Sequence, residues 1–282
     1  EVRTRLSGTS LQAGTFTLQE GMPYGDAIQA LSETPAAPRT VKLTIPEGRA
    51  RRETAPLVKK AGLSGSYLQA SERARGFSTR KYGAPRRTPS LEGFLFPATY
   101  DLEPDASSRD LVGQQLETFE REIKKVDMRR ARQRNLSTYE VLIIASMIDR
   151  EARLAKERRV ISGVIHNRLR EDMPLGIDAT IRYATRNWSR PLRQSELEMD
   201  SPYNTRRRLG LPPTPIGSPG LESIRAAANP ADTDYLYYVV KPNGDGAHSF
   251  SSSDAELQRD VEAYKREQAA RGGKDPSSSD GN

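Results

Sequence analysis

The sequence predicts an α+β fold, with a small N-terminal α+β module followed by a larger, helix-rich α+β domain. Three patterns predict it. Apolar and polar residues alternate over residues 41–45, as in a half-buried strand. Apolar residues recur at helical spacing through residues 137–169, which indicates buried helices. Residues 235–240, YLYYVV, form the clearest strand pattern in the chain, and helical patterns separate it from the first strand.

The N-terminal module is predicted to span residues 1–71. It begins with a short strand over residues 15–18 and a helix over residues 26–32. Proline and glycine end the strand over residues 41–45, and a second helix follows over about residues 51–60. A unit of this kind is more often a binding or spacer module than a catalytic one.

A basic linker is predicted over residues 72–90, which lack periodicity and are rich in arginine, glycine and proline. Its charge indicates a solvated face, with contact to an anionic polymer as the alternative. The next segment, residues 91–102 (LEGFLFPATYDL), is aromatic in a chain with only 6% aromatic residues. It is either a hydrophobic clamp at the entrance of the larger domain or a set of rings that contacts a ligand.

The larger domain is predicted over residues 91–268. After a helix at about residues 108–126, its centre is the stretch from Ser137 to Leu169. Ser137 and Glu140 match a capping box, in which each side chain bonds to the backbone of the other. An apolar stripe then follows at helical spacing, so a buried helix is expected here, and a second one after it.

Two carboxylates near the end of this helix have different settings. Asp149 has Arg153 four residues on, which predicts a solvated ion pair on the helix surface. Its replacement by asparagine is therefore expected to leave most activity intact. Glu151 has only apolar neighbours at these spacings and lies at the margin of the apolar stripe. Such a setting raises the pKa of a carboxyl group and suits a general acid; the alternative is a side chain that merely reaches solvent at the stripe's edge.

The remainder of the domain alternates loops with short elements. Two stretches rich in short polar residues, 176–183 and 201–216, come first, and the prolines of the second exclude a long helix. A short helix over residues 221–228, a hairpin built on YLYYVV and a closing helix over residues 254–268 follow. Residues 269–282 are predicted to be a disordered tail.

Composition narrows the chemistry. The chain has no cysteine, which excludes thiolate nucleophiles and cysteine metal sites, and two histidines that lie far apart, which disfavour a zinc site or a serine triad. The net charge of +7 favours acidic partners, but no nucleic-acid motif accompanies it, so nucleic-acid binding is not expected. No apolar run approaches 18 residues. We therefore expect neither a metal nor a cofactor.

Several long motifs, taken in order, resemble one family. They are EGFLFPATY, ASMIDREA, HNRL, MPLGIDATIRYA, SPYNTRRRLGLPPTPIGSPGLESIRAAANP, and YLYYVV with GAHSFS. Together they resemble the endolytic murein transglycosylases, the MltG or YceG-like group, over about residues 14–264. The resemblance implies that the N-terminal module is LysM-like and that residues 91–268 form a transglycosylase domain. Within this family's Ala-Ser-x-x-x-x-Glu motif, the catalytic acid falls on Glu151.

The resemblance also implies a function and a location. The enzyme would cleave the bond between N-acetylmuramic acid and N-acetylglucosamine within peptidoglycan strands without water, leaving 1,6-anhydro ends and terminating nascent strands. One N-terminal membrane helix, absent from this sequence, would anchor it in the bacterial cytoplasmic membrane with its body on the extracytoplasmic side. Peptidoglycan synthases and elongation or division proteins are its expected partners.

Polar and aromatic residues around these motifs are the candidate substrate contacts. They are Glu92, Phe94, Tyr100, Asn167, Asp178, Thr180, Tyr203, Asn204 and Thr205. Phe94 and Tyr100 could stack on sugar rings, while Tyr203, Asn204 and Asp178 could stabilise the positive charge of the transition state. The sequence departs from the family at a few positions, with Arg206 where an aromatic residue is expected.

Two other functions stay open from the residues. A muramidase-type hydrolase of the same bond would use a second carboxylate, for which Asp178 or Glu92 could serve. A non-catalytic cell-wall binding protein would use its LysM-like module for binding and Glu151 only for structure. The chemical structure of the products distinguishes a hydrolase from a transglycosylase. Substitution of Glu151 distinguishes a binding protein from an enzyme, because only an enzyme loses activity.

Overall fold

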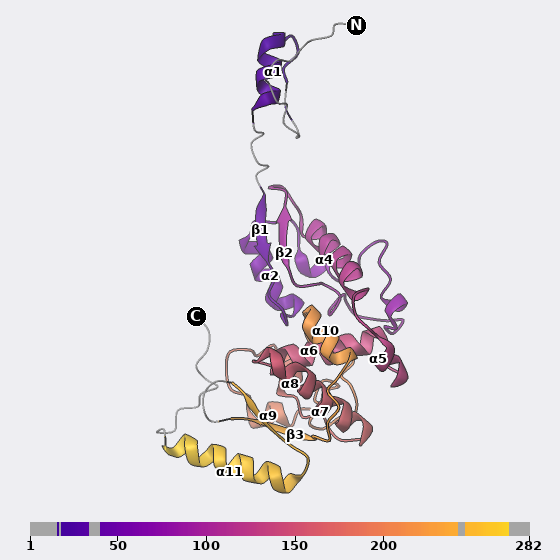
Figure 1. The fold of residues 1–282 in the computed structure, drawn as a ribbon, viewed down its shortest axis with the longest axis vertical. Coiled ribbons are helices and arrows are strands. Elements are labelled where there is room, and N and C mark those ends of the chain that lie inside the picture. Colours follow the sequence, from indigo (N-terminus) through magenta and orange to yellow (C-terminus); the bar gives the residue numbers. More distant parts are fainter. Residues whose placement is uncertain (1–15, 17, 34–39, 242–245, 271–282) are drawn as a thin grey trace. The chain divides into compact units, whose positions relative to one another are not determined.

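The computed structural model describes residues 16, 18–33, 40–241 and 246–270. It divides the chain into two compact units, residues 1–40 and residues 41–282 (Figure 1). The described part of the first unit contains one helix, α1 (Tyr24–Ser32), which confirms the predicted helix there. Of the strand predicted over residues 15–18, residues 15 and 17 lie outside the described residues, and residues 16 and 18 are not in a strand.

The second unit begins with a strand that pairs far along the chain. β1 (Val41–Thr44) pairs antiparallel with β2 (Thr99–Leu102), so that Leu43 lies opposite Tyr100. Helix α4 (Ser108–Ile123) packs against β2, and α3 (Tyr67–Ala70) packs between α4 and α2 (Arg51–Lys60). The fold is therefore α+β, as predicted.

This pairing moves the domain boundary. Residues 41–71 belong to the same compact unit as the larger domain, because half of the β1–β2 sheet comes from each side of the predicted linker. Arg150 of the central helix also pairs with Glu53 of α2 and lies over the ring of Trp188, 3.6 Å from its centroid. A LysM-like module over residues 1–71 is therefore not confirmed, and the chain divides at residue 40 instead.

The predicted linker, residues 72–90, is partly packed rather than fully exposed. It contains the 3₁₀ helix η1 (Thr79–Tyr82). The rings of Phe77 and Tyr82 join a cluster in which Phe94 and Phe119 meet edge to face, 5.3 Å between centroids. Burial of these rings offsets part of the cost of ordering the segment, because each ring removes apolar area from water.

The helical body follows from α4. Its elements are α5 (Arg129–Gln133), α6 (Thr138–Glu151), the 3₁₀ helix η2 (Ala155–Glu157), α7 (Arg158–Arg170), α8 (Asp178–Thr185), α9 (Gln194–Leu197) and α10 (Leu221–Ala228). α6 packs against α7, α8 and α10. α8 corrects the sequence analysis, which described its residues as a polar stretch and did not predict a helix there.

A hairpin and a helix close the unit. β3 (Tyr237–Val240) pairs antiparallel with β4 (His248–Ser251), and α11 (Asp254–Ala270) packs on both strands (Figure 1). The predicted turn between the strands lies largely outside the described residues, as does most of the predicted tail. Across the residues that the structure describes, no helix has the length and apolar character needed to cross a membrane.

The aromatic cluster generates a stability prediction. Phe94 is fully buried, with 0% of its surface exposed, and touches three other rings of the cluster. Phe94→Ala should lower the free energy of unfolding by about 3–5 kcal/mol, because it removes ring contacts and leaves a cavity. Urea denaturation measures it. Leu209→Ala, at a 60% exposed side chain, is the control and should change stability by less than about 0.5 kcal/mol; equal effects would contradict the prediction.

Candidate active site

Glu151 is the last residue of the central helix. α6 starts with the predicted capping box: the Ser137 amide donates to Glu140 Oε2 at 2.7 Å, and the Glu140 amide donates to Ser137 Oγ at 3.2 Å. Almost every residue from Tyr139 to Ile148 is buried, so the helix is enclosed on all sides. Ala152 then turns extended, with ψ at 103°, and ends it. Glu151 therefore lies at the edge of the core, where the helix ends, and its side chain is partly buried.

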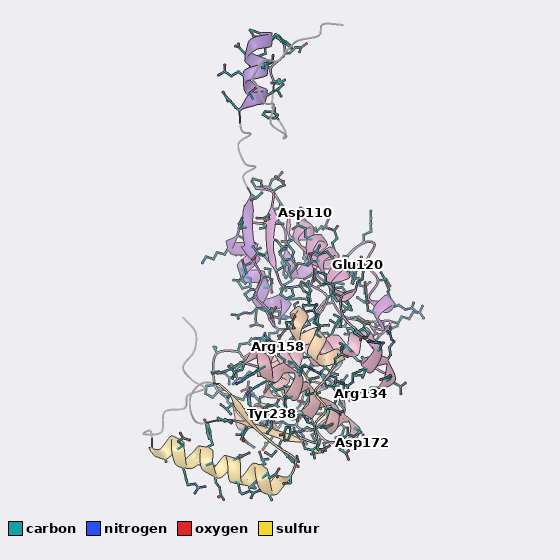
Figure 2. All side chains as sticks on the ribbon, in the orientation of Figure 1. Asp110, Glu120, Arg134, Arg158, Asp172 and Tyr238 are labelled. Atoms are coloured by element: carbon teal, nitrogen blue, oxygen red, sulfur yellow. The ribbon has the colours of Figure 1, made fainter. Side chains whose placement is uncertain are left out.

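The Glu151 carboxyl group lies in a protein environment that favours its neutral form. Burial raises its pKa from 4.5 to about 7. Tyr238 of β3 (Figure 2) donates a hydrogen bond from its hydroxyl to Glu151 Oε2 at 3.2 Å. This hydrogen bond partly offsets the rise in the pKa of Glu151. The direction of this shift in the pKa of Glu151 agrees with the one expected from the sequence. A carboxyl group with a pKa near neutrality can both give and accept a proton.

Three further charged side chains act on the pKa of Glu151, two from α8 and one from the loop after α9. Asp178, the first residue of α8, raises the pKa of Glu151, while Arg206 lowers it. Asp178 and Arg206 form an ion pair with 2.6 Å between Oδ1 and Nε. Arg182, one turn along α8, also lowers the pKa of Glu151. The site therefore combines one partly buried acid with a second carboxylate that an arginine already holds.

The sequence analysis missed Tyr238. Alternation along β3 places Tyr238 on the opposite face from its neighbour Tyr237, but nothing in the sequence relates it to an acid 87 positions away. Arg206 was noticed only as a departure from the family. Its ion pair with Asp178 gives that departure a physical role.

Asp149 corrects the sequence analysis. Its side chain is 3% exposed, and its carboxylate accepts hydrogen bonds from the Gly220 amide at 2.8 Å and from the Ser223 hydroxyl. Among the described residues its cationic neighbour is Arg158, 3.9 Å away, and not Arg153. Burial raises the pKa of Asp149 to about 6. Spacing four residues apart predicts an ion pair only for helix surfaces, and this end of α6 is covered by α10.

The two predicted sugar-stacking rings lie in the core. Phe94 is 0% exposed and Tyr100 is 5% exposed, and the Tyr100 hydroxyl donates to the Phe96 carbonyl. Neither ring has a face open to a ligand, so the clamp interpretation of residues 91–102 holds and the stacking interpretation is wrong. Aromatic enrichment alone does not distinguish a core from a sugar site.

Glu92 is also buried, away from the groups that act on Glu151. Its carboxylate accepts from the Arg51 amide at 3.1 Å and from the Tyr183 hydroxyl at 3.2 Å. Burial raises its pKa to about 7. Its contacts connect the start of α2 to α8, which is a structural role.

The other predicted substrate contacts brace loops. Asn167 donates to the Thr233 and Tyr235 carbonyls, and Asn204 donates to the Leu197 and Met199 carbonyls. The remaining three also have internal partners: Thr180 and Thr205 bond to each other at 3.0 Å, and the Tyr203 hydroxyl bonds to Thr214 at 2.8 Å. Of the nine predicted contacts, only Asp178 lies among the charged groups that act on Glu151.

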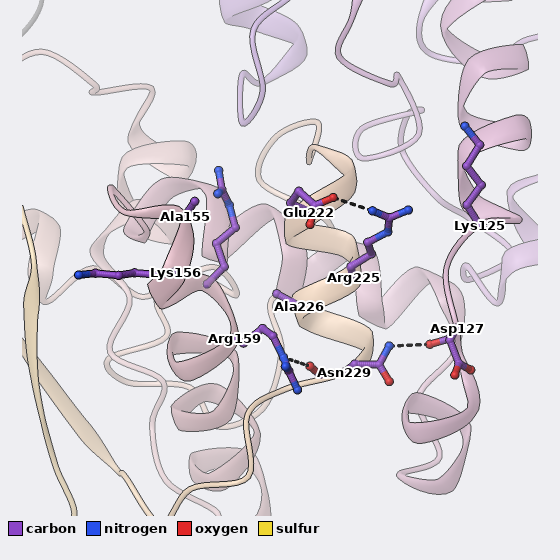
Figure 3. A pocket seen from close by; sticks show the side chains of 10 residues that line it. Lys125, Asp127, Ala155, Lys156, Arg159, Glu222, Arg225, Ala226 and Asn229 are labelled. Atoms are coloured by element: carbon purple, nitrogen blue, oxygen red, sulfur yellow. Dashed lines mark hydrogen bonds and ion pairs between the residues drawn. The ribbon is translucent and has the colours of Figure 1, made fainter.

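A cavity of about 450 Å³ lies elsewhere, between α10 and the start of α7 (Figure 3). Its cationic side chains do not converge: Arg225 pairs with Glu222, Arg159 donates to the Asn229 carbonyl, and Lys156 points away from both. In the described ranges, no cluster of three or more histidine or acidic residues could hold a metal ion. Glu151 therefore remains the centre of the candidate site.

The comparison with known proteins decides the family. A model of the YceG-like family matches residues 1–263. The chain belongs to the YceG-like family. An endolytic murein transglycosylase of Bacillus subtilis (strain 168) is 39% identical over 163 residues, 55% of this chain and 43% of that protein. One of Streptococcus pneumoniae serotype 2 (strain D39 / NCTC 7466) is 30% identical over 262 residues, 82% of this chain and 47% of that protein.

The fold is shared with a solved structure. The crystal structure of a yceG-like protein from Listeria monocytogenes matches with a TM-score of 0.68 and 28% identity. The match covers 88% of this chain and 85% of that one. The YceG-like chain described here matches less than half the length of the two curated relatives.

The buried contacts of Asp149 generate a second prediction. Asp149→Ala should lower the free energy of unfolding by about 2–4 kcal/mol, because the Gly220 amide and the Ser223 hydroxyl lose their acceptor. Urea denaturation measures the change. Asp101→Ala is the matched control: Asp101 is 59% exposed in a 3.9 Å pair with Lys42, and its loss should cost less than about 1 kcal/mol. A change of less than about 1 kcal/mol for Asp149→Ala would contradict this prediction and favour the solvated ion pair expected from the sequence.

The raised pKa of Glu151 generates a third. Folding raises this pKa from 4.5 to about 7, so its favourable contribution is complete below about pH 4.5 and is lost as the pH rises through 7. Glu151→Gln, which carries no charge, should therefore be more stable than the wild type by about 3 kcal/mol at pH 8 and equal at pH 4. Denaturation at both pH values measures it. Glu117→Gln, an exposed control, should show no such pH dependence; a Glu151→Gln variant less stable at pH 8 would contradict the prediction.

Proposed function

We propose that this protein is an endolytic lytic transglycosylase of peptidoglycan, with Glu151 as its catalytic acid and base. The observation that carries the proposal is one carboxyl group at a helix end, partly buried, with a pKa of about 7 and a hydrogen bond from Tyr238. The names of the relatives from Bacillus and Streptococcus, endolytic murein transglycosylase, support the reaction class. The substrate is the β-1,4 bond between N-acetylmuramic acid and N-acetylglucosamine inside a glycan strand.

The first step uses protonated Glu151 as an acid. It donates its proton to the bridging oxygen, the bond from this oxygen to C1 of the muramic acid breaks, and the departing strand leaves with a hydroxyl group. Positive charge develops on C1 and the ring oxygen. The Asp178 carboxylate, which already acts electrostatically on Glu151, is the candidate to stabilise that charge. Asn204 is excluded from this role because its side chain is fully buried and bonded to its own loop.

The second step uses the same residue as a base. The Glu151 carboxylate takes the proton from the C6 hydroxyl of the same muramic acid, and O6 forms a bond to C1. The product is a 1,6-anhydro ring, and Glu151 regains its proton. No water enters the products. A single carboxyl group with a pKa near the working pH is sufficient for both proton transfers.

The state of the other acids supports a transglycosylase over a hydrolase. Hydrolysis of a glycosidic bond normally needs a second carboxylate that is free to act on water or on the sugar. Asp178 is held by Arg206 at 2.6 Å, and Glu92 is buried under hydrogen bonds from Arg51 and Tyr183. Asp178 can therefore act on the developing charge only electrostatically, and neither acid is free to activate water or to attack C1.

The location and the partners extend the same proposal. Because nascent strands lie outside the cytoplasmic membrane, the proposed location is that membrane, with a single-pass anchor and the catalytic body on the extracytoplasmic side. Peptidoglycan synthases and elongation or division proteins are the proposed partners. The net charge of +7 is compatible with approach to an anionic cell wall.

Mass spectrometry of the products tests the proposal. Purified peptidoglycan is incubated with the wild type, with Glu151→Gln and with Glu117→Gln. The wild type and Glu117→Gln should release anhydro-ended muropeptides. Glu151→Gln should lower the rate by at least about 10³-fold, because glutamine cannot transfer a proton.

Two results would contradict the proposal. Reducing ends, which are one water heavier, would show hydrolysis and require a second carboxylate such as Asp178. Equal cleavage by the wild type and Glu151→Gln would show that another residue carries the chemistry. Circular dichroism of each variant establishes that it is folded.

A further inference from the structure

Glu157 is a buried carboxylate that the proposed reaction does not use. It ends η2, six positions after Glu151, and is 6% exposed. Its carboxylate binds one residue of a distant strand at two points. The His248 amide donates to Oε1 at 3.0 Å, and His248 Nδ1 lies 2.8 Å from Oε2. The second contact is a hydrogen bond to the carboxylate in the His248 tautomer that carries a proton on Nδ1.

His248 contacts the tyrosine of the candidate site directly. It is the first residue of β4 and lies opposite Val240, while Tyr238 lies opposite Phe250. Tyr238 and His248 are therefore diagonal neighbours on the hairpin. Their rings meet edge to face, 5.3 Å between centroids and 87° between planes. A continuous chain of contacts thus runs from Glu157 through His248 and Tyr238 to Glu151.

The hairpin needs anchors of this kind. Two strands of four residues form only a marginally stable sheet by themselves. On the side before β3, Arg168 Nε donates to the Leu236 carbonyl at 2.6 Å, which ties the chain to α7. On the side of β4, Glu157 provides the corresponding tie to the helical body. β3 is therefore held just before its first residue, and β4 is held at its first residue, next to the turn.

We propose that Glu157 and His248 form a positioning pair that holds Tyr238 against Glu151. The kinetic part of this inference rests on the proposed function, whereas its structural part does not. Apolar packing could also anchor the hairpin, and burying an apolar residue costs less free energy than burying a polar pair of similar size. The pair joins η2 to β4. Tyr238 lies between His248 of this pair and Glu151, and contacts both.

Loosening this pair has a defined consequence at Glu151. The hydroxyl of Tyr238 stabilises the charged form of Glu151, so its loss raises the pKa of that carboxyl group further. The other charged groups that act on Glu151 come from α8 and the following loop: Asp178, Arg182 and Arg206. None of them contacts Glu157 or His248 among the described interactions, so they remain in place when the pair is removed.

The test is a titration of Glu151 in the full chain. Carbon-13 NMR of glutamate-labelled protein follows the side-chain carboxyl signal, which Glu151→Gln identifies by its disappearance. Tyr238→Phe should raise the pKa of Glu151 by about one unit, the size of one hydrogen bond to a charged group. Glu157→Gln should raise it in the same direction by roughly half to one unit. The falling limb of the pH–rate profile for peptidoglycan cleavage should move to higher pH by the same amounts.

A double variant separates positioning from a general loss of structure. If Glu157 acts through Tyr238, Glu157→Gln adds no shift when Tyr238 is already phenylalanine. Glu171→Gln, which removes an exposed carboxylate at the end of α7, is the matched control and should shift nothing. An unchanged pKa in Glu157→Gln, or the same shift with and without Tyr238, would overturn the inference.

A second variant covers the case in which Glu157→Gln does not fold. His248→Gln keeps a side-chain donor for Glu157 but removes the ring that contacts Tyr238. It should raise the pKa of Glu151 as Glu157→Gln does, and no change would overturn the inference. Because the NMR titration needs no turnover, the inference survives or fails separately from the proposed function, which fails if the wild type releases no anhydro products.

Discussion

The burial of the middle of α6 is the constraint on which the rest of this structure depends. A helix packed against α7, α8 and α10 leaves little solvent for the polar groups at its end, so each finds a partner within the protein. Asp149 bonds to the start of α10, and Arg150 pairs with Glu53 of α2. Glu151 meets Tyr238 of β3. Three consecutive residues thus connect the end of one helix to three different elements, and the acid is oriented by the anchoring of its two neighbours.

The same burial sets the protonation chemistry and its cost. Desolvation raises the pKa values of Asp149, Glu92 and Glu151 to between about 6 and about 7. Each of these groups therefore makes the fold less stable as the pH rises toward neutrality. For Asp149 and Glu92, hydrogen bonds from backbone amides compensate part of that cost. Glu151 accepts from a tyrosine hydroxyl and not from a backbone amide, which suits a group that must exchange a proton. The acid without a backbone donor is thus the one proposed to be catalytic.

The sequence predicted local elements well and distant contacts poorly. The bounds of α2 and α10 and the capping box of Ser137 follow from signals within a few residues. The domain boundary failed because β1 and β2 pair across more than fifty positions. The surface ion pair of Asp149 failed because helix spacing carries no information about what covers the helix. Phe94 and Tyr100 failed as sugar contacts since an aromatic segment looks the same in a core and in a binding site. The apolar setting of Glu151 is a local pattern, but its assignment as the acid comes from the resemblance to the family and stays a prediction.

Tyr238 shows why the site as a whole could not be read from the sequence. Its hydroxyl reaches Glu151 only because a small hairpin, 87 positions later, is fixed to the helical body. That hairpin is held at β4 by Glu157 and ahead of β3 by the side chains of Asn167 and Arg168. Asn167 was expected to bind substrate, yet its amide supports the backbone that leads into β3. Polar residues of this kind lie near a site in sequence and in space without touching a ligand. Their proposed effect on the chemistry is indirect, because they hold the hairpin that carries Tyr238 in place.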